Sequence, residues 1–212
     1  VMAVVHAYDA LLPERVPMVF PALLRLLRAS PDVAYLATRS ALALAKAKKV
    51  DMVPVMSSFY VRASDPAYLA RSKLRVLVCV SPSSHASVLA NELGAYAHAP
   101  SIPLALDSVT ALGLLARRHG EVSELCLQLL MDLVQEATIP TLVLSRAVQI
   151  TKALVRVSSP SMAATIVTRF CLRLFVPLAR RGRSLDAPKI RILTDPASRA
   201  SVLWMLGQYA EL

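Results

Sequence analysis

Prolines, many of which stand beside a capping residue such as serine or aspartate, interrupt the apolar runs of this chain, and they limit the length of any regular element that it can form. Proline cannot continue a helix from the preceding turn, whereas Ser and Asp accept hydrogen bonds from the free amides at a helix N-terminus. Each interval between these marks is one or two helices long. The marks include Pro13, Pro31, Pro66, Pro82, Pro100, Pro140, Pro160 and Pro196.

The residues between these marks favour helices over strands. Of the 212 residues, 56% are hydrophobic and only 5% are aromatic, and the five glycines form no Asn-Gly or Asp-Gly hairpin dipeptide. Ala and Leu, which are good helix formers, are abundant. The composition therefore predicts an all-α fold with a substantial core and argues against a disordered chain.

The spacing of the apolar residues is helical. Between Glu121 and Glu136, apolar and polar side chains fall on opposite faces. The apolar face consists of Val122, Leu125, Cys126, Leu129 and Leu133, and the polar face of Glu121, Glu124, Gln128, Asp132 and Gln135. Similar patterns predict helices over 18–29, 33–46, 68–80, 84–96, 102–118, 142–157 and 162–174.

Helices of this length with links of about two to six residues give pairs of about forty residues, the period of HEAT and armadillo repeats. We predict a curved right-handed α-solenoid that occupies residues 1–212 as a single segment. A helical bundle is the structural alternative, but a solenoid grows more readily by adding pairs that contact only their neighbours. Because residues 1–8 and 207–212 resemble helices cut partway, we expect an internal segment of a longer protein.

Residues 57–66 form a short polar junction between two helical runs. Asp65 can accept a hydrogen bond from the free amides of the next helix, while Pro66 can occupy its first position. We therefore expect one helix to end near Val61 and the next to begin at Pro66. Ser64, Asp65 and Pro66 are the predicted structural residues of a repeat boundary, and as a lost helix cap Asp65→Ala would cost about 1 kcal/mol.

The sequence contains no recognisable catalytic, metal or cofactor motif. Its four histidines lie far apart without H-E-x-x-H or G-x-S-x-G spacing, and its scattered glycines form no phosphate-binding loop. Cys79, Cys126 and Cys171 are more than forty positions apart in apolar segments, which predicts buried, reduced thiols of a cytosolic protein. No apolar stretch is long enough to cross a bilayer. We therefore expect that the protein is not an enzyme and that it binds neither a metal ion nor a cofactor.

Positive charge is concentrated near the C-terminal end. Residues 169–199 hold eight basic and two acidic residues, a net +6 of the chain's formal +10. Such a stretch can bind anionic lipids, each Lys or Arg being worth about 1 kcal/mol, bind an acidic partner, or remain solvated. Because no aromatic residues are interleaved for base stacking, we expect no nucleic-acid binding. The candidate lipid- or partner-binding residues are Arg180, Arg181, Arg183, Lys189 and Arg191.

The junction also carries a family resemblance. Its sequence, Ser57-Ser58-Phe59-Tyr60-Val61-Arg62-Ala63-Ser64-Asp65-Pro66, resembles the S-F-Y-V-R-x-x-D-P signature of β-adaptins, the large β subunits of clathrin-type adaptor complexes. The resemblance is collinear over nearly the whole chain. Residues 23–36 are similar to an L-L-R-L-L-R-S helix, 68–77 to the helix after D-P, and 199–211 to R-A-x-x-x-W-x-x-G-E-Y-A-E. The Phe-Tyr-Val-Arg spelling is closest to the β subunit of the third adaptor complex.

The resemblance implies a structural subunit of a vesicle coat. Such a trunk assembles with a second large, a medium and a small subunit, with a small GTPase and an anionic membrane surface as further partners. It implies a cytoplasmic protein, peripheral on Golgi and endosomal membranes and coated vesicles. The sequence departs from the β-adaptin pattern in two places. Leu114 and Leu115 replace the usual basic and small residues, and the stretch 176–196 is longer and more basic than the short link of the family.

A free-standing HEAT or armadillo peptide-binding scaffold, such as a transport receptor, is the functional alternative. Those receptors often carry ladders of Asn and Trp on their inner helices. This chain has one Asn and one Trp, which favours the adaptor.

Overall fold

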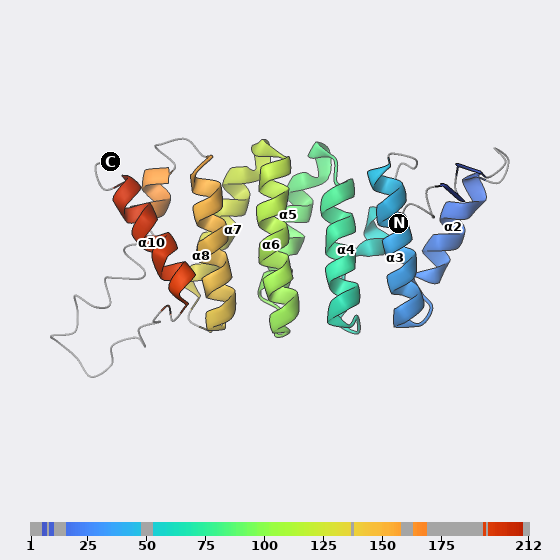
Figure 1. The fold of residues 1–212 in the computed structure, drawn as a ribbon, viewed down its shortest axis with the longest axis horizontal. Helices are drawn as coiled ribbons and strands as arrows, with labels where there is room; N and C mark the ends of the chain where they lie inside the picture. Colours follow the sequence, from blue (N-terminus) through green and yellow to red (C-terminus); the bar gives the residue numbers. More distant parts are fainter. Residues whose placement is uncertain are drawn as a thin grey trace. The chain divides into compact units, whose positions relative to one another are not determined.

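The computed structural model describes a chain of helices (Figure 1). Its described residues contain no strand, so the predicted all-α fold class is confirmed for this part of the chain. The described residues are 6–7, 9–10, 16–47, 53–136, 138–157, 163–168, 193 and 195–209.

The helices lie where the sequence pattern predicts them. Up to residue 157, the ends of the predicted helices differ from the observed ends by at most three residues. The predicted helix over 162–174 is described only at 163–168, which are helical. In chain order the elements are α2 (Val16–Leu26), α3 (Pro31–Lys46), the 3₁₀ helix η1 (Val53–Phe59), α4 (Ala67–Val80), α5 (Ser83–Ala97), α6 (Ile102–Arg118), the 3₁₀ helix η2 (Gly120–Val122), α7 (Ser123–Gln135), α8 (Thr141–Val155) and α10 (Pro196–Tyr209).

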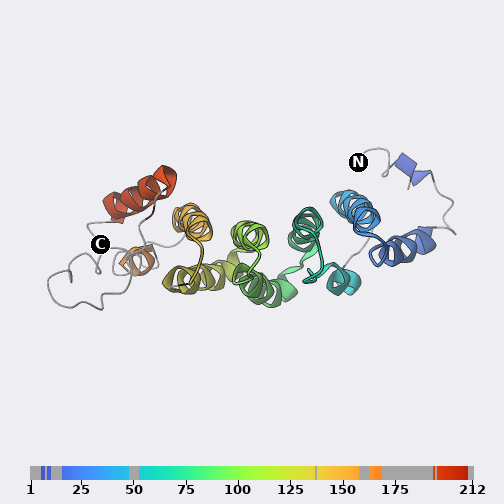
Figure 2. The ribbon, with the colours of Figure 1, turned by 90° about the horizontal axis from the view of Figure 1, so that it is seen from below.

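The chain divides into two compact units, residues 1–89 and 90–212. In the first unit, α3 and α4 pack side by side in one layer, while α2 packs on α3 and η1 on α4 from the other layer (Figure 2). In the second unit, α6, α8 and α10 form one layer, and α7 contacts α6 and α8 from the other. Successive helices thus alternate between two layers, as in HEAT- and armadillo-like repeats and unlike a bundle around one core. The single segment over 1–212 stays a prediction.

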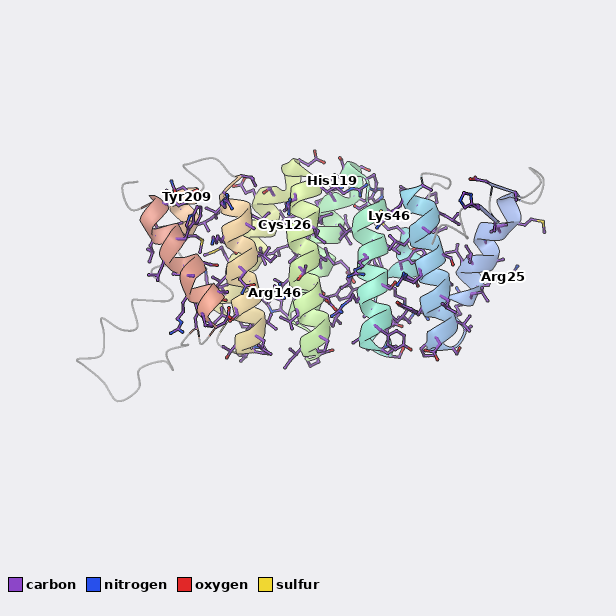
Figure 3. All side chains as sticks on the ribbon, viewed as in Figure 1. Arg25, Lys46, His119, Cys126, Arg146 and Tyr209 are labelled. Atoms are coloured by element: carbon purple, nitrogen blue, oxygen red, sulfur yellow. The ribbon has the colours of Figure 1, made fainter. Side chains whose placement is uncertain are left out.

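Burial on α7 follows the predicted pattern and exceeds it. All five residues of the predicted polar face are exposed, and Val122, Cys126 and Leu133 of the apolar face are buried. The helix buries a wider surface than the predicted stripe, because it contacts both α6 and α8. Side chains fill the spaces between neighbouring helices within each unit (Figure 3). The further buried residues of α7 are Leu127, Leu130, Met131 and Val134.

The cysteines agree only in part with the prediction. Burial raises the pKa of the Cys126 thiol to about 12, so this thiol stays protonated and unreactive near neutral pH. Cys79 is also a free thiol, but it is half-buried, so the prediction of full burial is wrong there. Cys79 lies near the end of α4, where its side chain is partly exposed to solvent. Cys171 lies outside the described residues.

Gly113 allows a close approach between α6 and α8. A Cβ atom built at this position would lie 2.6 Å from Cγ2 of Ile150, far inside van der Waals contact. Glycine in a helix interior costs about 1 kcal/mol relative to alanine. The residue is therefore explained by packing between the helices and not by helix propensity.

We predict that Gly113→Ala lowers the free energy of unfolding by roughly 1–3 kcal/mol, because the added methyl group overlaps Ile150. Urea unfolding followed by circular dichroism measures this loss. Adding Ile150→Ala removes Cγ2, so the double variant should lose less than the sum of the single variants. Gly207→Ala is the matched control, since its Cβ meets no atom within 4 Å. Equal losses for the two glycine variants would contradict this explanation.

Candidate interaction site

The junction begins with a 3₁₀ helix that is anchored in the core. Met56 and Phe59 of η1 are 5% and 1% exposed. Residues three apart lie on the same side of a 3₁₀ helix, so both side chains point into the first unit. The helix that we expected to end near Val61 is thus a short 3₁₀ segment that ends at Phe59. Such segments seldom exceed about four residues, and Pro54 and two serines weaken an α-helix here.

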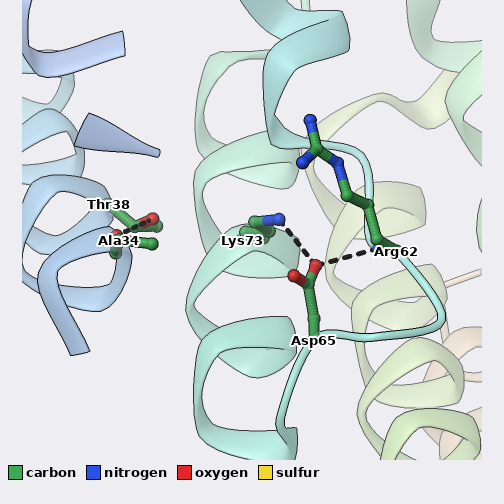
Figure 4. Close-up of polar contacts among 5 residues, drawn as sticks. All are labelled: Ala34, Thr38, Arg62, Asp65 and Lys73. Carbon is green, nitrogen blue, oxygen red and sulfur yellow. Dashed lines mark hydrogen bonds and ion pairs between the residues drawn. The ribbon is translucent and has the colours of Figure 1, made fainter. Parts of the chain in front are cut away.

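Asp65 holds the junction against the following helix. Its Oδ2 atom accepts hydrogen bonds from the Arg62 backbone N–H at 2.8 Å and from Lys73 Nζ at 2.6 Å (Figure 4). The Asp65 N–H in turn donates to the Arg62 carbonyl at 3.0 Å, which closes the turn. The side chains of Lys73 and Asp65 are 2% and 9% exposed. A buried ion pair therefore connects the turn to α4.

The predicted capping contact of Asp65 is wrong. Helix α4 begins at Ala67, and the N-cap is Pro66, which has extended backbone and makes no side-chain capping bond. The Asp65 carboxylate is turned away from the α4 amides because it binds Lys73 and the preceding turn. Ser64 is exposed. The structural role of Ser64, Asp65 and Pro66 at a repeat boundary stays a prediction.

Sequence reasoning did not identify Lys73 as the partner of Asp65. The signal was present, because Lys73 stands four residues after Leu69 and four before Leu77, both buried on α4. Residues four apart share one helix face, so the lysine had to lie among apolar side chains. A buried lysine requires a carboxylate or another partner.

An aromatic surface covers the neighbouring helices α3 and α4. The rings of Tyr35 and Tyr68 meet edge to face with centroids 5.5 Å apart. The Tyr68 hydroxyl donates to Asp32 Oδ1 at 2.8 Å, which raises the pKa of Tyr68. Arg39 donates from Nη1 to the Tyr35 hydroxyl at 3.0 Å and lies 5.8 Å from that ring centroid. We define the α3–α4 surface by Asp32, Val33, Tyr35, Leu36, Arg39 and Tyr68.

The α3–α4 surface has the composition of a protein interface. Its Leu36 side chain is 64% exposed beside the tyrosine pair. Aromatic residues and Arg, represented here by Tyr35, Tyr68 and Arg39, are enriched in protein–protein interfaces. The hydrogen bonds within the surface hold its aromatic side chains in place before any partner binds. This arrangement can bind a protein surface. The residues of the α3–α4 surface do not include a catalytic nucleophile paired with a general base.

In the second unit, Asp195 fixes the start of α10. Its Oδ2 atom lies 2.5 Å from the Ser198 hydroxyl, and it accepts bonds from the Ser198 N–H at 2.8 Å and from Gln149 Nε2 at 3.0 Å. Ser198 also lies 3.1 Å from the Ser145 carbonyl of α8. The bonds from the Ser198 hydroxyl and amide, with that from Gln149, lower the pKa of Asp195. Asp195 thus caps α10 and links it to α8.

The described residues offer no metal site and no membrane-spanning helix. Among the described residues, no group of three or more His, Cys, Asp or Glu side chains is placed to hold a metal ion. No helix in the same part of the chain is long and apolar enough to span a membrane. The predicted basic residues Arg180, Arg181, Arg183, Lys189 and Arg191 lie outside the described residues.

We predict that Asp65→Ala lowers the free energy of unfolding by about 3 kcal/mol, because it leaves the Lys73 ammonium buried and unpaired. This cost exceeds the roughly 1 kcal/mol of a lost helix cap. Urea unfolding measures it, with the exposed Asp132→Ala as the control. The double variant Asp65→Ala with Lys73→Met should recover most of the loss. A loss of only about 1 kcal/mol without recovery would contradict the buried-pair interpretation.

The pKa of Asp195 predicts how the docking of α10 depends on pH. Because the pKa of Asp195 in the folded protein lies below its ordinary value of 3.8, its stabilising contribution is complete above that pH and is lost as pH falls through the lower folded pKa. Fluorescence of Trp204, the only tryptophan of the chain, reports on α10. Asp195→Asn should remove this part of the acid transition. An unchanged acid transition in that variant would contradict the assignment.

Comparisons with known proteins place the chain in a family over its whole length. The Adaptin N terminal region family matches residues 1–212. AP-3 complex subunit beta-1 of Canis lupus familiaris and AP-3 complex subunit beta-2 of Mus musculus are each 26% identical over 212 residues, 100% of this chain. AP-1 complex subunit beta-1 of Homo sapiens is 26% identical over 191 residues, 90% of this chain. The chain spans 18% of the length of each of these relatives. The match confirms the resemblance to β-adaptins, and the chain belongs to the Adaptin N terminal region family.

Proposed function

We propose that the chain is a structural part of the large β subunit of a heterotetrameric vesicle-coat adaptor complex that acts in intracellular protein transport. The observation that carries this proposal is the match of the chain to β subunits of AP-3 and AP-1 complexes over 90–100% of its length. The relatives are adaptor subunits and not transport receptors, which favours this function over a free-standing scaffold. The chain acts by assembly and recruitment and not by catalysis.

Two observations support an AP-3 type of β subunit. The AP-3 relatives match all 212 residues, whereas the AP-1 relatives match 191 at the same identity. The Phe59-Tyr60-Val61-Arg62 spelling of the junction points the same way. Because Phe59 is 1% exposed, this part of the signature holds η1 in the core.

On this proposal the partners are a second large, a medium and a small adaptor subunit. A small GTPase and an anionic membrane surface recruit the complex to Golgi and endosomal membranes and to coated vesicles. The basic residues from Arg180 to Arg191 are candidates for contact with lipid or with an acidic partner, since each cation near an anionic surface contributes about 1 kcal/mol.

The α3–α4 surface is the candidate subunit contact. Leu36 is 64% exposed, and complete burial of a leucine side chain contributes roughly 1.5–3 kcal/mol. Tyr35 and Tyr68 are held by each other and by Arg39 and Asp32, so they lose little side-chain entropy on binding. Tyrosine and arginine are enriched among the residues that contribute most to binding at interfaces.

Affinity purification of the tagged full-length protein from its own cells, followed by mass spectrometry, tests the proposed function. We expect stoichiometric recovery of a second large, a medium and a small adaptor subunit. The identity of the other large subunit would establish the complex type. Recovery of nuclear transport factors or cargo peptides in their place would refute the adaptor function.

We predict that Leu36→Asp in the full-length protein reduces recovery of the other subunits roughly tenfold, because a buried charge in place of an apolar contact costs more than about 1.4 kcal/mol. Leu142→Asp is the matched control, since Leu142 is 63% exposed on α8. Equal recovery with the two variants, at equal protein levels, would exclude the α3–α4 surface as a subunit contact.

A further inference from the structure

A basic cleft lies in the first unit between the end of α2 and η1. Its volume is about 470 Å³, within the roughly 300–1,000 Å³ of small-molecule sites. Arg25 and Arg28 line it from the last turn of α2 and the turn that follows, and Arg62 lines it from the turn after η1. Ser57 and Ser58 add two hydroxyl groups from η1. No carboxylate is among the described residues that line the cleft.

The three guanidinium groups have no carboxylate partner in the described part of the chain. Arg62 contacts Asp65 only through its backbone N–H, and its guanidinium group extends away from that carboxylate (Figure 4). The Asp65 carboxylate is already occupied by Lys73. Arg25, in the last turn of α2, and Arg28, in the turn that follows, are exposed and stand three residues apart. Three like charges around one cavity repel each other, and an anion in the cavity relieves that repulsion.

The donors fit phosphate better than other anions. Guanidinium groups present planar pairs of N–H donors that bind phosphate oxygens in a bidentate manner, and serine hydroxyls add single donors. The cleft also holds more than a bare phosphate, and Leu27 provides a buried apolar wall. It has no aromatic side chain on which a nucleobase could stack. These features together favour a small phosphorylated compound without a base.

We propose that the cleft of Arg25, Arg28, Arg62, Ser57 and Ser58 binds the phosphate groups of a small organic phosphate, either free in solution or as a lipid headgroup. None of these residues belongs to the basic stretch 180–191. It does not rest on the proposed membership of an adaptor complex, because its ligand contacts this chain alone.

Titration calorimetry of the full-length protein, purified with its bound subunits, tests the site. The probes are inorganic phosphate and pyrophosphate, with sodium chloride at matched ionic strength as the blank. We expect pyrophosphate to bind more tightly than phosphate, since it can contact more than one arginine. The pair Arg25→Ala and Arg28→Ala should raise the Kd for pyrophosphate at least tenfold.

The matched control is the pair Arg117→Ala and Arg118→Ala. These two arginines are exposed in the last turn of α6 in the second unit. Their substitution removes the same amount of charge as the substitution of Arg25 and Arg28. The control should change the Kd less than twofold. Equal weakening by both pairs, or no heat beyond the blank, would overturn the proposal. Arg28→Lys keeps the positive charge but loses the paired N–H donors of the guanidinium group. Its Kd for pyrophosphate should therefore lie between those of the wild type and the double variant.

Two further arms identify the source of the phosphate. Cosedimentation compares vesicles that contain a phosphatidylinositol phosphate with vesicles of equal charge made with phosphatidylserine. Stronger cosedimentation with the phosphatidylinositol phosphate vesicles, lost in the Arg25/Arg28 variant, would identify the ligand as a lipid headgroup. Equal cosedimentation with both kinds of vesicle would identify it as a free phosphorylated compound. A phosphoserine peptide that binds the cleft more tightly than pyrophosphate, and loses binding in the same variant, would overturn the small-molecule assignment.

Discussion

The inner helices of each described unit bury their apolar surface against more than one neighbour. Helix α6 illustrates the constraint, because Val109, Leu112 and Leu115 are at most 1% exposed and the helix packs on both α7 and α8. Helix α4 likewise lies between α3 and η1 in the first unit. Because apolar burial is the main stabilising contribution, an inner helix such as α6 depends both on the next helix in its layer and on the helix across from it. The two-layer arrangement within each unit follows from this dependence.

The same constraint determines where polar groups are tolerated. Some hydroxyl groups inside the layers bond to the carbonyl four residues earlier in their own helix. Thr38 donates to Ala34 at 2.7 Å (Figure 4), and Ser201 donates to Ala197 at 2.7 Å. Such a residue needs no partner on the next helix. A lysine ammonium cannot be satisfied in this way, since it has three donors and a full charge. Lys73 is therefore buried only because the junction supplies Asp65.

The sequence predicted the helices well because each carries its own period and its own punctuation. It did not predict the contacts of Asp65, because an aspartate before proline can bond forward or backward. The chain contains the same Asp-Pro-Ala tripeptide twice. Asp195 bonds forward to the Ser198 amide, whereas Asp65 bonds backward to Arg62 and to the lysine eight residues later. The residue eight positions after Asp195 is Leu203, which offers no charge. The α3–α4 surface was also unpredictable, since nothing local pairs Tyr35 with Tyr68.

The net charge of +10 conceals two kinds of cation that act differently. Charge alone attracts any anion within a Debye length of about 8–10 Å, and salt weakens that attraction. Guanidinium groups around a cleft discriminate among anions by the directions of their N–H bonds. Arg25, Arg28 and Arg62 are held by α2 and by the turn that Asp65 closes. The ion pair with Lys73 thus fixes one wall of the cleft, and it leaves the Arg62 guanidinium without a competing carboxylate.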